Sequence, residues 1–158
     1  VHTFQSPNGG SLGCINDGIV EFQRQPLQTH LPNSLKLSEN LTVLPSVAVL
    51  YGYAGDDGRL AAAAIAAGMK GIVYAGMGNG SIPVPVEREL ARAVRTGVTV
   101  VRSSRSYAGC VTSAEDSYIR AGFLEAGALN PAKARILLQL ALAESKCPAA
   151  IQAMFRQY

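Results

Sequence analysis

The 158-residue sequence has few of the side chains from which metal sites and disulfide frameworks are built. It contains three cysteines and two histidines, at Cys14, Cys110, Cys147, His2 and His30. The cysteines are odd in number and widely separated, so they do not form a complete disulfide framework. A structural zinc site needs about four cysteine or histidine ligands at close spacing, and that spacing does not occur here. We therefore expect incidental thiols, no metal and no cofactor.

Long apolar runs and clusters of positive charge are also missing. The longest strongly apolar stretch, Leu60 to Ala67, is far too short to cross a bilayer, which takes about 20 residues. The 14 basic residues are scattered and the net charge is +3, so neither nucleic acid nor a membrane is an expected partner. The first residues, Val1 to Phe4, show no signal-peptide pattern. The 48% hydrophobic content is instead typical of a folded domain.

A complete set of hydrolytic side chains is missing as well. Many hydrolases place a serine, threonine or cysteine beside a histidine and a carboxylate. Both histidines lie in the N-terminal part of this chain, and no triad can be assembled around them. We therefore name no catalytic residue in this chain.

Pro45 divides the sequence into a loop-rich part and a regular part. Residues 1–25 contain one β-hairpin signal, in which two short apolar segments flank the turn Asn16-Asp17-Gly18. A lone hairpin is marginally stable in water, so this segment is expected to pack against something else. Residues 26–45 are rich in Pro, Asn and Ser and are predicted to be a linker.

Residues 46–158 alternate between strand and helix patterns. Near-continuous apolar strands separated by helices predict an α/β domain with a parallel sheet covered on both faces. The expected strands cover residues 47–53, 71–75 and 98–102, with a short fourth strand at 121–124. The expected helices cover residues 59–67, 86–96 and 131–145, with a last helix from Pro148.

The sharpest local signal is Gly76-Met77-Gly78-Asn79-Gly80-Ser81, at the carboxyl end of a predicted strand, where ligands of open parallel sheets bind. A dinucleotide loop is disfavoured because Ser81 replaces the third glycine of G-x-G-x-x-G. The next strand also ends in Arg102 rather than in an acidic residue. A tight turn explains the glycines but not Ser81, so the local sequence leaves a turn and a binding loop open.

Charged residues follow the other strand ends. Asp56 and Asp57 precede a predicted helix and are expected to cap its positive end. The segment Arg102-Ser103-Ser104-Arg105 either binds an anion or pairs with carboxylates at a subunit interface, and we favour the interface. Glu115 and Asp116 lie in a polar loop, where a solvated role is the default.

Three blocks of this sequence together resemble one family. They are Ala75–Ser81 (AGMGNGS), Val100–Arg105 (VVRSSR) and Leu129–Leu138 (LNPAKARILL). They resemble the C-terminal domain of bacterial type II L-asparaginases and glutaminase-asparaginases. Residues 1–25 are similar to the end of that family's N-terminal domain, so the resemblance covers essentially the whole chain.

The resemblance implies hydrolysis of the side-chain amide of L-asparagine, and often of L-glutamine, to the acid and ammonia. The family uses a threonine nucleophile, assisted by a second threonine, an aspartate and a lysine, and forms an acyl-enzyme. Those residues belong to T-G-G-T-I and T-D-T motifs of its N-terminal domain, and neither motif occurs here. The chain is therefore expected to be the C-terminal portion of an amidohydrolase, inactive alone. The alternative is a non-catalytic α/β ligand-binding or dimerisation module.

Two substrate-binding residues carry over from the family. Ser81 matches the polar residue that closes the glycine loop and orients an aspartate near the substrate, and is expected to act within its own subunit. Glu115 matches a glutamate that enters the neighbouring subunit and contacts the substrate's ammonium, with a one-residue spacing change after Arg105. A donated residue implies a homo-oligomer, and the family usually forms a dimer of dimers. The resemblance also implies a periplasmic location.

Overall fold

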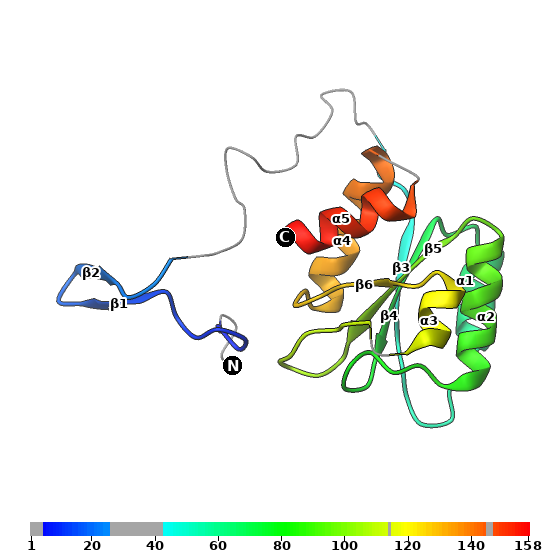
Figure 1. The fold of residues 1–158 in the computed structure, drawn as a ribbon, viewed down its shortest axis with the longest axis horizontal. Coiled ribbons are helices and arrows are strands. Elements are labelled where there is room, and N and C mark those ends of the chain that lie inside the picture. The colour runs from blue at the N-terminus through cyan, green and yellow to red at the C-terminus, as the bar shows by residue number, and fades with distance from the viewer. Residues whose placement is uncertain (1–4, 26–42, 114, 145–146) are drawn as a thin grey trace.

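The computed structural model describes residues 5–25, 43–113, 115–144 and 147–158 (Figure 1). The core of the molecule is a four-stranded sheet in the order β3-β4-β5-β6. Its strands are β3 (Val47–Tyr51), β4 (Gly71–Gly76), β5 (Thr99–Ser104) and β6 (Leu124–Glu125). All three strand pairs are parallel, with Val47 opposite Gly71 and Gly71 opposite Thr99. The predicted α/β class with a parallel sheet is confirmed.

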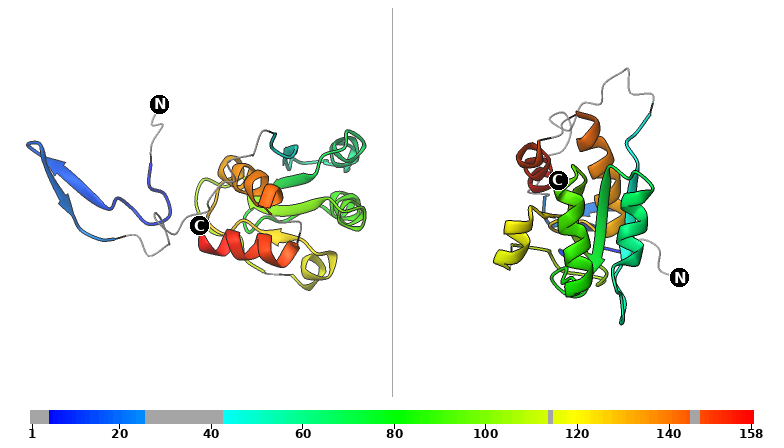
Figure 2. Two further views of the ribbon diagram at one scale, coloured as in Figure 1. Left: turned by 90° about the horizontal axis from the view of Figure 1, so that it is seen from above. Right: turned by 90° about the vertical axis from the view of Figure 1, so that its right-hand side faces the viewer.

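Helices cover both faces of this sheet (Figure 2). One face packs on α4 (Pro131–Glu144) and α5 (Pro148–Gln157) through Val73 and Val101. The other face packs on α1 (Arg59–Ala66), α2 (Val84–Arg95) and α3 (Asp116–Ala121) through Ile72, Tyr74 and Val100. Neighbouring residues of a strand point to opposite faces, so Ile72 and Val73 enter different cores. This two-sided burial explains why all six residues of β4 are buried.

The N-terminal part contains the predicted hairpin, β1 (Gly13–Asn16) paired antiparallel with β2 (Ile19–Phe22). Its turn uses positive φ angles at Asp17 and Gly18, 48° and 80°, as the Asn-Asp-Gly sequence requires. The apolar side chains of the hairpin remain exposed, with Phe22 76% exposed. The hairpin's N-terminal flank touches the α/β part at Asn8, whose side chain exchanges two hydrogen bonds with the backbone of Gly109. Most of the predicted linker, residues 26–42, lies outside the described residues.

Three predictions about the elements are wrong. Residues 116–121 form α3 instead of the end of a polar loop, and the last strand is Leu124–Glu125, not 121–124. A six-residue helix is too short for a periodic apolar pattern, and α3 is held by burial of Tyr118. Helix α2 begins at Val84, two residues earlier than predicted, with Pro85 in its first turn, where the missing N–H costs no helical hydrogen bond.

Within the part of the chain that is described, no helix combines the length and apolarity needed to cross a bilayer. The same residues contain no group of three or more His, Cys, Asp or Glu side chains arranged to hold a metal ion.

Candidate functional site

The carboxyl ends of the strands carry three loops, at residues 52–58, 77–83 and 105–115. In an open parallel sheet this edge is where ligands bind. Both predicted site residues lie at this edge. Ser81 is in the second loop, and Glu115 is the last residue of the third.

The glycine loop closes on itself as a tight turn. The Ser81 amide donates to the carbonyl oxygen of Met77 at 2.8 Å, and the Met77 amide donates back to the Ser81 carbonyl at 3.3 Å. Gly78 and Gly80 have φ angles of 51° and 69°. Gly76 is required by close approach, because a Cβ there would lie 2.3 Å from the Ser81 carbonyl oxygen. The amides of Met77 and Ser81 are therefore used to close the turn itself.

Asn79, at the tip of this turn, ties it to the loop that leads to Glu115. Its amide oxygen accepts a hydrogen bond from the Thr112 amide at 2.8 Å. Its amide nitrogen donates to the Thr112 hydroxyl oxygen at 3.3 Å. A further bond runs from the Ser104 hydroxyl to the Gly78 carbonyl oxygen at 2.7 Å. The segments that carry Ser81 and Glu115 are thus fixed against each other.

Both candidate residues are exposed at this edge. Ser81 lines a cavity of about 230 Å³ together with Tyr53, Tyr74, Met77 and Arg105. Glu115 is the N-cap residue of α3, with extended backbone angles of −132° and 130°, and its side chain makes no capping bond to the helix. An acidic side chain at this position that does not cap its helix is available to a ligand.

Arg102 does not lie where the sequence predicts. Its side chain is only 1% exposed inside its own chain, so the predicted pairing at a subunit interface is wrong for this residue. Its Nη2 donates to the Thr112 carbonyl oxygen at 2.6 Å, and its guanidinium carbon lies 4.2 Å from the centre of the Tyr118 ring. Burial lowers the pKa of Arg102, and the carboxylates of Glu125 and Glu115 oppose this shift. Arg105, at the exposed end of the same segment, donates to the Gly52 carbonyl oxygen at 2.6 Å.

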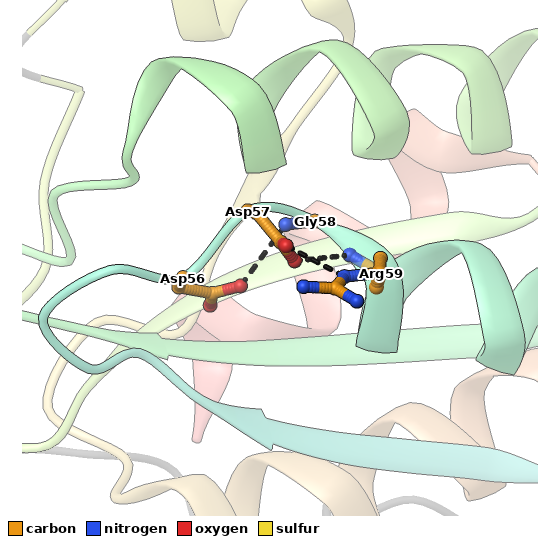
Figure 3. A network of polar contacts seen from close by, with 4 residues as sticks. All are labelled: Asp56, Asp57, Gly58 and Arg59. Carbon is orange, nitrogen blue, oxygen red and sulfur yellow. Dashed lines mark hydrogen bonds and ion pairs between the residues drawn. The ribbon is translucent and has the colours of Figure 1, made fainter.

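The two aspartates at the start of α1 behave partly as predicted (Figure 3). Asp57 accepts a hydrogen bond from the Arg59 amide, the first amide of α1, at 3.1 Å and so stabilises the positive end of the helix. Asp56 accepts one from the Gly58 amide, just before the helix, also at 3.1 Å. The N-cap residue itself is Gly58, with φ of 86°. Asp56 is also buried and accepts the Tyr74 hydroxyl at 2.9 Å, a structural contact that the sequence does not predict.

A second cavity, of about 460 Å³, lies at the opposite edge of the sheet and is lined by Leu44, Pro45, Lys70 and Leu142 among others. Its lining is mainly apolar and offers one charged side chain, Lys70. Ligands of parallel sheets bind at the carboxyl edge, so this cavity is not the candidate site.

Comparison with known proteins decides the family. Residues 46–155 match the model of the Glutaminase/Asparaginase C-terminal domain. The chain belongs to the glutaminase/asparaginase family. It is 45% identical to L-asparaginase 2 of Escherichia coli, over 100% of this chain and 46% of that protein. It is 34% identical to a Glutaminase-asparaginase of Pseudomonas fluorescens, over 98% of this chain and 43% of that protein. The family resemblance seen in the sequence is confirmed.

A solved structure of a family member agrees. The Probable Cytoplasmic L-asparaginase of Campylobacter jejuni superposes with a TM-score of 0.91 at 43% identity, over 98% of this chain and 50% of that one. The chain therefore spans about half the length of the relatives that it matches.

The structure places at this edge two residues that the sequence did not single out, Thr112 and Tyr118, and gives Arg102 a position that the sequence did not predict. The structure brings Arg102, Thr112 and Tyr118 between the segments that carry Ser81 and Glu115. Thr112 follows Asn79 by 33 residues, and the local sequence around either residue does not predict their contact. A buried arginine in a strand that reads V-V-R-S-S-R is likewise without a sequence signal, because arginine is usually exposed.

Proposed function

We propose that the protein takes part in hydrolysis of the side-chain amide of L-asparagine, with L-glutamine as a second substrate, to the acid and ammonia. The observation that carries the proposal is the joined pair of loops at the carboxyl edge of a glutaminase/asparaginase C-terminal domain, which presents Ser81 and Glu115. The names of the relatives, L-asparaginase 2 and Glutaminase-asparaginase, support the two substrates.

Glu115 is proposed to hold the substrate's ammonium group. A free amino acid carries a positive charge that a carboxylate binds by a charge-assisted hydrogen bond, and this fixes the side-chain amide in register for attack. The exposed Glu115 side chain, free of a capping bond, suits that role. Ser81 is proposed to orient the acidic group that shares this task.

We further propose that Ser81 and Glu115 act at one and the same active site. This differs from the expectation drawn from the sequence, in which Ser81 acts within its subunit and Glu115 in the neighbouring one. The reason is the pair of bonds between Asn79 and Thr112, which fixes the two segments against each other. Two side chains that are fixed on one surface can contact the same ligand. They are less suited to contact separate ligands bound in two different subunits.

The nucleophile is proposed to be a threonine outside these 158 residues. The T-G-G-T-I and T-D-T motifs do not occur in the sequence, and the relatives are about twice as long as this chain.

Residues 1–25 are proposed to complete a neighbouring domain, which would cover the exposed apolar side chains of the hairpin. The whole protein is proposed to form a homotetramer and to act in the periplasm, the location in the name of a Haemophilus influenzae relative 42% identical to this chain.

The test compares ammonia release from L-asparagine and L-glutamine by two preparations, the complete gene product that contains these residues and the 158-residue chain alone. We expect release by the first and none by the second. Turnover by the chain alone would contradict the proposal that the nucleophile lies elsewhere. A complete gene product that binds but does not hydrolyse either amino acid would indicate a non-catalytic ligand-binding module instead.

A further inference from the structure

The most unusual buried group of the domain is the guanidinium of Arg102. It lies on β5 with a side chain 1% exposed. Among the residues that the structure describes, no carboxylate forms an ion pair with it, and its Nε and Nη1 atoms have no hydrogen-bond partner. Burying a charged group without an ion pair is costly, so an arginine in this place calls for a compensating role.

The contacts of this guanidinium bracket Glu115. On one side, Nη2 donates to the carbonyl oxygen of Thr112, three residues before Glu115. On the other side, the guanidinium carbon lies over the ring of Tyr118, three residues after Glu115, 4.2 Å from the ring centre. One buried group thus holds both ends of the segment that carries the exposed carboxylate.

The same two residues also hold the segment that carries Ser81. Thr112 exchanges two hydrogen bonds with Asn79, two residues before Ser81. The Tyr118 hydroxyl accepts the amide of Ile82, the residue after Ser81, at 3.0 Å. Arg102 therefore lies at the centre of a cluster in which Thr112 and Tyr118 each contact both the guanidinium and the glycine-loop segment.

We propose that Arg102 is a positioning residue for substrate recognition, whose buried guanidinium holds Thr112 and Tyr118 against the glycine loop and so fixes Glu115 and Ser81 relative to each other. This rests on the proposed function. Arginine suits the role because its planar group can stack on a ring and donate along its edge at once. A lysine ammonium keeps the charge but has no plane to stack on Tyr118 while it reaches Thr112.

The first test is physical and does not depend on catalysis. Amide hydrogen exchange is measured on the 158-residue chain and on Arg102→Lys, with Arg95→Lys on the exposed face of α2 as the matched control. We expect faster exchange in the segments 77–82 and 111–118 of Arg102→Lys, unchanged exchange in β4, and no change in Arg95→Lys. A folded Arg102→Lys with wild-type exchange in both segments overturns the proposal.

The second test is kinetic and uses the complete gene product. Arg102→Lys is expected to raise KM for L-asparagine about tenfold with kcat within about twofold, because a misplaced carboxylate weakens binding of ground and transition states alike. If Arg102 acts through Glu115, the double variant with Glu115→Gln has the KM of Glu115→Gln alone. Independent, multiplying effects of the two substitutions contradict the proposal, since they show that Arg102 does not act through Glu115.

If Arg102→Lys does not fold, Tyr118→Phe tests the same proposal. It keeps the ring under the guanidinium and removes only the hydroxyl that accepts the Ile82 amide. Exchange at Ile82 is expected to rise, with a smaller increase of KM than in Arg102→Lys; unchanged exchange and KM count against the proposal. If Glu115→Gln itself leaves KM unchanged, the proposed function of Glu115 fails, while the exchange experiment still tests whether Arg102 holds the two segments.

Discussion

Substitution of Tyr74 by phenylalanine tests the polar contact beneath the cavity that Ser81 lines. Tyr74 is fully buried on β4, and its hydroxyl donates to the Asp56 carboxylate at 2.9 Å. The phenylalanine ring fills the same space, so the packing is retained and the hydrogen bond is lost. A hydrogen bond to a charged group contributes about 1.5–3 kcal/mol. Asp56 keeps its bond from the Gly58 amide, and we therefore expect a loss of about 2 kcal/mol in the free energy of unfolding.

The assay is urea unfolding of the 158-residue chain at pH 7, with thermal unfolding beside it. A loss of this size lowers Tm by roughly 4–8 °C for a chain of this length. Tyr51→Phe is the matched control, because Tyr51 lies on the neighbouring strand β3 and is 57% exposed. A Tyr74→Phe variant as stable as Tyr51→Phe would refute the inference that this bond stabilises the fold.

The stability that the Tyr74–Asp56 pair contributes to the fold is expected to depend on pH. Burial, followed by the bond to Asp56, raises the pKa of Tyr74 above its ordinary value of 10.0. A group whose folded pKa is raised contributes stability that is fully present below its unfolded pKa and is lost as the pH rises above it. The stability difference between the wild-type chain and Tyr74→Phe should therefore be full at pH 7 and smaller at pH 10.5. A difference that grows above pH 10 would contradict this assignment.

Two further substitutions test the site and the core. In the complete gene product, Ser81→Asn is expected to lower activity on L-glutamine relative to L-asparagine, because the shorter serine leaves more room and one fewer amide contact; an unchanged ratio of the two activities contradicts this. In the 158-residue chain, Leu138→Ala in the fully buried face of α4 is expected to cost about 2–5 kcal/mol in urea unfolding, whereas Ile136→Ala, at a position 49% exposed on the same helix, should cost much less. Equal losses for the two would show that α4 does not pack as described.

The sequence predicted the regular part of the fold because its signals are local. The apolar runs that become β4 and β5 and the Asn130-Pro131 start of α4 each lie within a few neighbouring residues. Helix α3 escaped prediction because its stability depends on Tyr118, which is buried against Arg102, 16 residues earlier in the chain. A contact of that range leaves no periodic pattern.

The same distinction applies to the candidate site. The glycine loop could be located from the sequence, because the local backbone requires glycine there. Gly76 leaves no room for a Cβ, and Gly78 and Gly80 have positive φ angles. The roles of Ser81 and Glu115 came from the family resemblance, and no local pattern predicts them. The cluster around Arg102 could not be foreseen, since the sequence alone favoured an exposed position for this side chain.

The most direct test of the account is the KM for L-asparagine of the complete gene product carrying Glu115→Gln. Loss of a charge-assisted contact of about 1.5–3 kcal/mol predicts a rise in KM of about 10- to 100-fold. The control is Glu144→Gln, an exposed glutamate at the far end of α4. The account predicts a raised KM for Glu115→Gln and a wild-type KM for the control. Equal KM values for the two variants would contradict the claim that this domain positions the substrate through Glu115.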